Sequence, residues 1–533
     1  MDFQELLREF NLSPEFSLAV SDEIQELPSS VPAEDTKGRR DLTKLNIFTI
    51  DGEDAKDLDD AVSIQMLENG NYLLGVHIAD VSHYVRENTQ LDREAMDRGT
   101  SVYLVDTVVP MLPKKLSNGI CSLNPRCIRL TMSVFMELND KANIVDYEIC
   151  ESFIKSKHRL TYKEVTKLLE GDEQLAEKYK DIEGDLRIME ALSKKLTAKR
   201  RRRGGLDFDL PETKVITDEN GKPVEIKRYE ITVSNHIIEE FMLACNETVA
   251  RHLNKLELPC VYRVHEKPEG GKVEKLILML RGLGYDYRPK ENISSNSLQK
   301  VLDDFKDTEY ETAVSTVMLR SMMKARYSDE SLGHFGLAAV YYCHFTSPIR
   351  RYPDLAVHRI LKTWLHGDMN DWKITHFRRY AKRAADLSTD AEINAVDAER
   401  KWTEVKICEY MKEFIGEEYE ATVMSVTSFG LFAELESSVS GLVPLSELKD
   451  DYYIFDEINN CLIGRRHKKI YRIGDKINVR LVRVDEEQLQ IDFVPCENIN
   501  KEKHRRKAEE NGNKTKSKKR YRNRNPKRRT KRR

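Results

Sequence analysis

The sequence lacks several patterns that would assign it to a class at once. No apolar run approaches the ~20 residues of a membrane-spanning helix, and the first residues, Met1-Asp2-Phe3, do not resemble a signal peptide. The 9 cysteines are scattered without a Cys-x-x-Cys pair, so neither a zinc knuckle nor a disulfide framework is indicated. These absences predict a reduced protein of the cytoplasm.

Negatively charged residues are scarce at the C-terminal end of the chain. From Lys501 to Arg533 there are 18 Lys and Arg residues against 3 Asp and Glu, a balance of +15. Because the whole chain of 533 residues has a formal charge of −3, the other 500 residues carry −18. An acidic body with a basic tail predicts a polyanionic partner, bound by the tail in a salt-sensitive way. The tail is expected to be disordered; its alternative role is to keep the protein soluble.

The most informative stretch is acidic and covers Ile50–Ala61, which reads IDGEDAKDLDDA. Six carboxylates fall within ten residues, between strands expected at 45–50 and 61–64. Carboxylates packed this closely raise one another's pKa unless a cation lies among them. Oxygen-only ligands favour Mg²⁺ or Mn²⁺ over Zn²⁺. A calcium EF-hand is excluded, because the sixth and twelfth positions from Asp51 hold Lys56 and Val62. An ordinary acidic surface turn is the alternative.

A second informative stretch lies at 345–354 and reads FTSPIRRYPD. Pro353 suits the first position of a helix, and Asp354 suits the positive end of that helix. The turn just before it holds Arg350 and Arg351. A guanidinium fixed there can bind a phosphate oxygen and offset the charge that builds up in a phosphoryl transition state.

Together these stretches resemble the ribonuclease II superfamily, and most closely its ribonuclease R branch. The resemblance spans nearly all of residues 1–500, with its strongest matches at 49–60, 98–119 and 334–358. It implies an α+β (mixed α/β) catalytic domain of the RNB type, followed by an all-β OB-fold barrel and the disordered basic tail. The expected divisions are an N-terminal helix and linker at 1–40, the catalytic core at 41–370, its helical part at 371–415, the barrel at 416–497 and the tail at 498–533.

For this family the resemblance implies a processive 3′-to-5′ exoribonuclease. It would hydrolyse single-stranded RNA to nucleoside 5′-monophosphates with Mg²⁺, or with Mn²⁺ as a substitute, in RNA degradation and quality control. The implied partners are single-stranded RNA, RNA with a 3′ overhang, and the ribosome or RNA-decay factors, and the implied state is a monomer. The family usually carries two cold-shock-type barrels before the catalytic domain. This chain starts just after them, as a fragment, an internal start or a natural short form would.

The resemblance also implies roles for single residues. The implied metal ligands are Asp51, Asp57, Asp59 and Asp60, with Asp59 the most damaging to lose, and Arg350 would stabilise the pentavalent phosphate. The implied RNA contacts are Tyr103, Tyr162, Phe208 (within one residue), Glu239 (favoured over its neighbour Glu240), Arg350, Phe429 and Phe432. Sequence alone favours a core position for Tyr103 and a plain surface position for Glu239. Each barrel phenylalanine could stack a base or belong to the core.

Several local patterns complete the expectations. Helices are predicted from Tyr162, with Thr161 as N-cap, and at 235–253. His77, Asp80 and His83 are three residues apart, but they need not converge from a strand, so structural histidines are favoured over a metal site. The run 199–203 is either a phosphate contact or a solvated helix end.

Two rival functions stay open beside the exonuclease. One is a non-catalytic RNA-binding or RNA-remodelling protein that keeps this fold; the intact set of four aspartates argues against it. The other is a different metal phosphoesterase, such as a DNA nuclease or a phosphatase. The expected barrel and the basic tail favour a polymer as the substrate.

Overall fold

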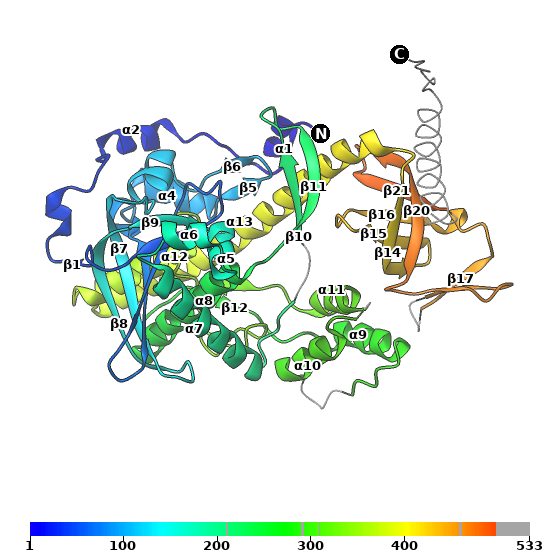
Figure 1. The fold of residues 1–533 in the computed structure, drawn as a ribbon. Helices are drawn as coiled ribbons and strands as arrows, with labels where there is room; N and C mark the ends of the chain where they lie inside the picture. The colour runs from blue at the N-terminus through cyan, green and yellow to red at the C-terminus, as the bar shows by residue number, and fades with distance from the viewer. Residues whose placement is uncertain (209–211, 289–292, 309, 458–460, 497–533) are drawn as a thin grey trace, which may run out of the picture. The chain divides into compact units, whose positions relative to one another are not determined.

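The computed structural model describes residues 1–208, 212–288, 293–308, 310–457 and 461–496 (Figure 1). The chain divides into two compact units, one of residues 1–222 and 229–404 and the other of residues 223–228 and 405 onward. The basic tail expected at 498–533 lies outside the described residues. Within the described ranges, no helix combines the length and the apolar character that crossing a bilayer requires.

The first unit is built on a seven-stranded sheet with the order β1-β8-β7-β4-β3-β2-β9. Its strands are β1 (Arg40–Asp41), β2 (Phe48–Asp51), β3 (Asp60–Met66), β4 (Tyr72–Ala79), β7 (Ile128–Leu138), β8 (Ile144–Lys155) and β9 (His158–Thr161). The two outer pairs, β1 with β8 and β2 with β9, are parallel, and the inner pairs are antiparallel. Nearly all residues of β4 and β7 are buried. Since successive side chains of a strand point to opposite faces, both faces of the sheet are covered.

Helices surround this sheet, and one of them begins at the predicted cap. The Thr161 hydroxyl accepts the N–H of Glu164, and the Glu164 carboxylate accepts the N–H of Thr161. The helices are α1 (Phe3–Glu9), α2 (Leu18–Glu26), α3 (Val81–Tyr84), α4 (Gln90–Arg98), α5 (Tyr162–Leu169), α6 (Glu173–Lys178), α7 (Glu183–Arg202), α8 (Val233–Lys255), α9 (Gly270–Gly282), α10 (Ser295–Phe305), α11 (Glu311–Ser321), α12 (Tyr352–Leu365) and α13 (Asp371–Met411). α8 confirms the helix predicted at 235–253, and it packs on β4 and α7.

Short elements complete the description of this part of the chain. A π-turn, η2 (Lys115–Ile120), follows the hairpin of β5 (Val102–Leu104) and β6 (Thr107–Val109). β12 (Tyr262–Val264) pairs with β13 (Arg326–Ser328). β10 (Glu212–Thr217) and β11 (Pro223–Tyr229) form a further two-stranded sheet.

The segment 1–40 differs from the single helix and linker that the sequence predicts. It forms α1, α2 and a 3-10 turn, η1 (Ala33–Thr36). Val20 and Ile24 of α2 are buried, and α2 packs against α4. The Glu23 carboxylate accepts the N–H of Leu91 at 3.0 Å. The linker prediction was wrong because the second helix is stabilised by a partner 68 residues away in sequence, which local composition does not reveal.

The second unit contains a closed barrel with the strand order β14-β15-β16-β21-β20, which confirms the predicted OB fold. Its elements are η3 (Lys412–Phe414), β14 (Glu418–Thr427), β15 (Gly430–Leu435), β16 (Ser440–Pro444), η4 (Leu445–Glu447), β20 (Lys476–Asp485) and β21 (Gln490–Pro495). Gly430 pairs with Pro444, and a Cβ on Gly430 would collide with the carbonyl oxygen of Val443. This close approach of two strands requires glycine.

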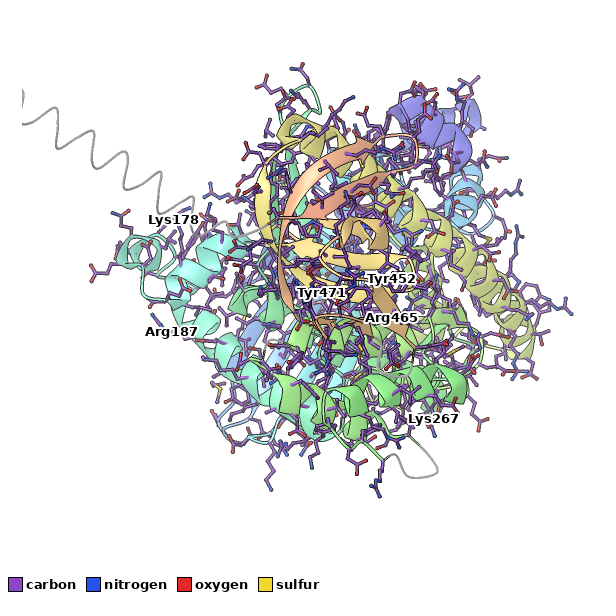
Figure 2. All side chains as sticks on the ribbon, turned by 90° about the vertical axis from the view of Figure 1, so that its right-hand side faces the viewer. Lys178, Arg187, Lys267, Tyr452, Arg465 and Tyr471 are labelled. Atoms are coloured by element: carbon purple, nitrogen blue, oxygen red, sulfur yellow. The ribbon has the colours of Figure 1, made fainter. Side chains whose placement is uncertain are left out.

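A second, three-stranded sheet belongs to the same unit. Its strands are β17 (Tyr453–Asp456), β18 (Cys461–Gly464) and β19 (Ile470–Tyr471). Tyr452 and Arg465 beside this sheet are exposed, and the Arg465 guanidinium lies 5.2 Å from the centre of the Tyr452 ring (Figure 2). A basic and aromatic surface of this kind is typical of nucleic-acid-binding barrels.

Candidate active site

The acidic loop at 52–59 connects two adjacent strands of the large sheet. Asp51 is the last residue of β2, and Asp60 is the first residue of β3. β2 and β3 are antiparallel with Phe48 opposite Val62, so both aspartates lie at the same edge of the sheet. This arrangement confirms the predicted turn between two strands. On the other side of β2, Asp51 pairs with Thr161, which directly precedes Tyr162.

One arginine holds the first half of the acidic loop. Nη2 of Arg159 on β9 donates to the carbonyl oxygens of Ala55 at 2.6 Å, of Glu53 at 2.9 Å and of Gly52 at 3.4 Å. A charged donor shared among neutral carbonyls binds them more strongly than a neutral donor would. The backbone of the loop is therefore fixed by a residue of the neighbouring strand.

Two further contacts hold the second half of the loop. The Ser122 hydroxyl donates to the carbonyl of Lys56 at 2.8 Å and accepts the N–H of Leu58 at 3.1 Å. The N–H of Ile349 donates to Oδ1 of Asp59 at 2.8 Å. Segments from three distant parts of the chain thus place the aspartates before any ligand binds.

The carboxyl groups of Asp51, Asp59 and Asp60 are withdrawn from solvent and have few hydrogen-bond donors. Burial raises the pKa of Asp51 to about 7 and that of Asp60 to about 6, and the charge of Asp60 adds to the shift at Asp51. Burial also raises the pKa of Asp59 well above its usual value, although the charge of Arg350 opposes this shift. Among the residues that the structure describes, Oδ2 of Asp51 and Oδ2 of Asp59 are buried and have no hydrogen-bond partner.

Buried carboxylate oxygens without donors, in a loop whose acids repel one another, fit a hard divalent cation. The described residues hold no group of three or more His, Cys, Asp or Glu side chains already arranged around one point. The carboxylates are thus not yet gathered as metal ligands, but their buried oxygens without donors are the stronger indication of a cation site. Rotation about two side-chain bonds is enough to turn an aspartate toward a cation. A cation could therefore be bound by Asp51, Asp57, Asp59 and Asp60, although their carboxylates do not yet point toward one position.

The two arginines of the turn at 347–351 have different surroundings. Nε of Arg350 lies 3.7 Å from Oδ2 of Asp59, and its side chain is 42% exposed. Arg351 is mostly buried and donates to Oδ1 of Asp354 at 2.8 Å. The same oxygen of Asp354 accepts the N–H of Ser347 at 2.7 Å. Arg350 is therefore accessible beside the acidic loop, whereas Arg351 holds the turn in shape.

Two tyrosines lie next to the aspartates. The Tyr103 hydroxyl donates to Oδ2 of Asp57 at 2.8 Å, and its ring is 39% exposed, so the core position that sequence alone favours was wrong. Its backbone N–H donates to the Glu399 carboxylate at 2.7 Å. Tyr162 is half-buried at the start of α5, and its pKa is raised by burial first and by the charge of Asp60 second.

Phe208 and Glu239 have no hydrogen bond, ion pair or ring contact with the acidic loop in the part of the chain that the structure describes. Phe208 is half-buried between α7 and β10. Glu239 is exposed on α8 and lies 3.2 Å from Nδ1 of His236. Its neighbour Glu240 is buried and pairs with the buried Arg200 at 2.8 Å. Of the two glutamates, only Glu239 is accessible, and its role in RNA binding stays a prediction.

The cationic run 199–203 is only partly solvated, and its contact with a phosphate stays a prediction. Three of its arginines bind carboxylates of the protein, in the pairs Arg200–Glu240, Arg201–Asp207 and Arg203–Glu247, whereas Arg202 is exposed and donates to the carbonyl of Ala198 at 3.2 Å. Lys199 donates to the carbonyl of Ala142 at 2.8 Å. The run therefore ties the end of α7 to the surrounding structure.

The histidines at 77 and 83 are structural, as the sequence analysis favours. The buried imidazole of His77 lies between the hydroxyls of Ser63, at 3.0 Å, and Ser133, at 2.7 Å. Asp80 is buried and paired with two cations from other parts of the fold. His83 pairs instead with a carboxylate of η1. His77 has partners of its own, whereas Asp80 and His83 share Arg39, whose Nη2 lies 2.7 Å from Oδ2 of Asp80 and 3.4 Å from Nδ1 of His83.

In the barrel, the structure distinguishes between stacking and core positions. Phe429 is 56% exposed, and Phe432 is half-buried with its ring centre 6.0 Å from that of Phe429. The interior of the barrel is filled by other side chains, including Leu431 and Phe493. Phe429 is therefore available to a ligand of this unit, and base stacking by either ring stays a prediction.

Sequence reasoning missed the residues that hold the site in place. Arg159, Ser122 and Asp354 act through contacts with residues distant in sequence. Arg159 stands in the strand just before the predicted N-cap, and nothing in its spacing marks it. Asp354 was noted only for the charge of the helix end. The sequence signals that could have revealed its role in holding the turn are the neighbouring Pro353 and the arginines at 350 and 351.

The fold and this edge of the sheet define a class of protein. The family model of the RNB domain matches residues 39–367, and that of the S1 RNA binding domain matches residues 412–494. The chain is 45% identical to ribonuclease R 1 of Lactococcus lactis over 494 residues, which are 92% of this chain and 60% of that protein. It is 44% identical to ribonuclease R of Aquifex aeolicus over 497 residues, 93% of this chain and 70% of that protein.

A solved structure agrees with these relatives. RNase R of Mycoplasma genitalium, in complex with ribose methylated single-stranded RNA, superposes with a TM-score of 0.85 at 30% identity, covering 92% of this chain and 77% of that chain. The chain therefore belongs to the ribonuclease R family of RNB-domain proteins. It spans 60% of the length of the Lactococcus lactis relative and 70% of that of the Aquifex aeolicus relative.

Proposed function

We propose that this chain is a processive 3′-to-5′ exoribonuclease that hydrolyses single-stranded RNA to nucleoside 5′-monophosphates. The observation that carries the proposal is the acidic loop, in which buried oxygens of Asp51 and Asp59 accept no hydrogen bond from the described residues and the Arg350 guanidinium lies 3.7 Å from Asp59. Such a pairing of acids and an accessible arginine suits displacement at a phosphodiester, where negative charge develops on the phosphate oxygens. Membership of the ribonuclease R family supports the direction of degradation.

Asp51, Asp57, Asp59 and Asp60 are the residues that would hold Mg²⁺, or Mn²⁺ as a substitute. A divalent cation supplies a Lewis acid that lowers the pKa of water and neutralises phosphate charge. The protein orients these ligands itself: the N–H of Ile349 fixes Asp59, and the Tyr103 hydroxyl fixes Asp57. Asp59 is oriented both by the N–H of Ile349 and by the Arg350 guanidinium, so we expect its neutralisation to impair chemistry most among the four.

The protein's own side chains would then bind and align the RNA. Arg350 binds the scissile phosphate, which its partial exposure beside Asp59 allows. Tyr103 and Phe208 pack against the terminal bases, and Tyr162 lines the site beside Asp51. Stacking of a base on an aromatic ring contributes about 1–3 kcal/mol. Further RNA contacts are assigned to Glu239, Phe429 and Phe432.

The wider setting of the activity is also part of the proposal. The relative from Mycoplasma genitalium was solved with single-stranded RNA, which supports the same substrate class here. RNA with a 3′ overhang as a substrate, the ribosome or RNA-decay factors as partners, a monomeric state, a cytoplasmic location and a role in RNA quality control follow from the family resemblance.

The proposal is tested with 5′-labelled single-stranded RNA in Mg²⁺, comparing the wild type with Asp59→Asn. Asp54→Asn is the matched control, because Asp54 is an exposed acid of the same loop. We expect a ladder that shortens from the 3′ end with wild type and Asp54→Asn, and intact RNA with Asp59→Asn although RNA binding persists. Intact RNA with wild type in both Mg²⁺ and Mn²⁺, despite binding, would favour the non-catalytic rival. Equal digestion of DNA would favour the general phosphoesterase.

A further inference from the structure

A cavity of about 420 Å³ lies in the first unit, away from the acidic loop. It is lined by residues of the segments 82–88, 359–363 and 372–377, which belong to α3 and the loop after it, to α12 and to the start of α13 (Figure 1). None of the aspartates, Arg350 or Tyr103 lines it. Its volume falls in the range of about 300–1,000 Å³ that is typical of small-ligand sites. The rise of about 1.5 Å per residue places Lys362 roughly 15 Å along α12 from Tyr352.

One wall of the cavity carries an open aromatic surface. Trp372 is 70% exposed, and its ring is stacked on that of His376 with an interplanar angle of 7° and a centroid distance of 5.6 Å. His376 is in turn nearly parallel to Tyr380, at 8° and 6.3 Å. One face of the indole is thus supported, while most of the side chain remains in contact with solvent. A preformed flat surface of this kind binds another planar ring at a small entropic cost.

The charges around the cavity are unequally compensated. Arg359 pairs with Asp92 at 2.7 Å, and Lys362 pairs with Asp80 at 2.9 Å. Glu87, the only acidic residue of the lining, lies 2.7 Å from Nε2 of His376. Its carboxylate is therefore already engaged.

Arg86 and Lys373 differ from the other cations of the lining. Within the described ranges, the side chain of neither residue makes an ion pair or a hydrogen bond, whereas the backbone N–H of Lys373 donates to Oδ1 of Asn370 at 3.0 Å. Arg86 is exposed and Lys373 is half-buried. The mouth of the cavity therefore has an excess of positive charge, which attracts an anion whose charge is compact.

From this combination we propose that the cavity binds a nucleotide unit, with the base against Trp372 and the phosphate between Arg86 and Lys373. A phosphate alone would leave the aromatic surface unused, and a nucleoside alone would leave both cations without a partner. The choice of a nucleotide over other aromatic anions rests on the proposed function, which supplies RNA and nucleoside 5′-monophosphates. Both sources present the same chemistry, a base and a phosphate on one ribose.

The site can be measured without catalysis, because the signal comes from a tryptophan in its wall. The chain has 3 tryptophans, so the Trp364→Phe/Trp402→Phe variant retains Trp372 as the only indole. Its fluorescence is titrated in EDTA with AMP, adenosine, inorganic phosphate and a 5′-phosphorylated 12-nucleotide RNA. Circular dichroism checks the fold of this variant. The same titrations of the native chain beside Trp372→Leu provide a second measurement if the fold is disturbed.

We expect AMP to quench Trp372 and adenosine to bind at least tenfold more weakly. Arg86→Gln/Lys373→Gln should weaken AMP at least tenfold, equivalent to about 1.4 kcal/mol, and leave adenosine within twofold. The matched control is Lys382→Gln, an exposed cation nine residues from Lys373, or two and a half turns, on the opposite face of α13. It should bind AMP as the wild type does.

The outcomes separate the two sources of ligand and the two proposals. Quenching by the RNA but not by AMP, weakened in the Arg86 and Lys373 variant, identifies the RNA chain as the source and supports the site. If neither AMP nor the RNA quenches the fluorescence, the proposal is overturned. It is also overturned if AMP binds the Arg86 and Lys373 variant as tightly as the wild type, or if inorganic phosphate binds as tightly as AMP. RNA shortening by the wild type without quenching by either AMP or the RNA refutes this inference alone, and AMP quenching without RNA shortening refutes the exonuclease alone.

Discussion

Arg159 offers the sharpest test of how the acidic loop is held. Replacement by Met keeps the aliphatic stem of the side chain and removes the guanidinium that binds the carbonyls of Glu53 and Ala55 at 2.9 and 2.6 Å. Hydrogen bonds to charged groups contribute about 1.5–3 kcal/mol each. Two such bonds sum to about 3–6 kcal/mol, and because Arg159 is only half-buried and the freed carbonyls can bind water, a value at or just below the lower end of that sum applies. We expect the closed loop to lose about 2–3 kcal/mol relative to open states.

Native-state hydrogen exchange measures this loss directly. The N–H of Ala55 donates to the carbonyl of Gly52 at 3.3 Å, and that of Leu58 donates to Ser122, so both amides report opening of the loop. At 1.4 kcal/mol per factor of ten, Arg159→Met should raise their exchange rates by roughly 30- to 150-fold. Amides in the middle of β4 should keep their wild-type rates, because the sheet itself is unchanged.

Lys163→Met is the control, since it removes another cation that contacts the same loop. Lys163 lies 3.7 Å from Glu53, and both side chains are more than 60% exposed. Surface pairs of this kind contribute about 0–1 kcal/mol. The variant should exchange within about threefold of the wild type. If Arg159→Met also stays within threefold, or if exchange rises equally throughout the sheet, the idea that Arg159 specifically holds this loop is refuted.

Three further predictions concern single residues. Arg350→Ala should reduce the rate of RNA shortening by a factor of about 10²–10³ without lowering the melting temperature. Arg351→Ala should instead lower the free energy of unfolding by about 3–5 kcal/mol, because it leaves the buried Asp354 carboxylate without its cation. Enzyme kinetics measure the first effect, and a denaturant titration measures the second. Gly430→Ala should unfold the barrel at a lower temperature, because the new Cβ meets the Val443 carbonyl; calorimetry measures it, and an unchanged transition would contradict the close approach. Burial lowers the pKa of His77 to about 3, so only the unfolded state takes up this proton as the pH falls from 7 to 5, and this imidazole should reduce the free energy of unfolding by about 2 kcal/mol over that interval; urea titrations of His77→Gln should lack this part of the pH dependence.

Much of the fold could be predicted from local patterns. The strands beside the acidic loop, the cap at Thr161, the helix α8 and the OB-type barrel all follow from periodicity, capping chemistry and turn residues. These elements are predictable because the residues that stabilise each of them are close together in the sequence. The second helix at the N-terminus was missed because α4 stabilises it from a distance.

The candidate site was predictable in its acids and only partly in its surroundings. Charge spacing marks Asp51 to Asp60, but the environment of Tyr103 depends on a hairpin whose tyrosine reaches Asp57 across the fold. The difference between Arg350 and Arg351 is likewise invisible in a doublet of equal charges, since it is set by the position of Asp354 one turn later. Which residues face a site depends on long-range packing, which neither periodicity nor composition encodes.

The acidic loop is also a point of local energetic frustration. Burial, and after it the charge of Asp60, raise the pKa of Asp51, and buried oxygens of Asp51 and Asp59 have no hydrogen-bond partner among the described residues, so in the absence of a ligand these groups oppose the fold that carries them. Replacing Asp51 by Asn removes one repulsive charge, and we expect this to raise the melting temperature of the metal-free protein while it impairs RNA hydrolysis. In this chain, selection for maximal stability and selection for phosphodiester chemistry would act on the same four side chains in opposite directions.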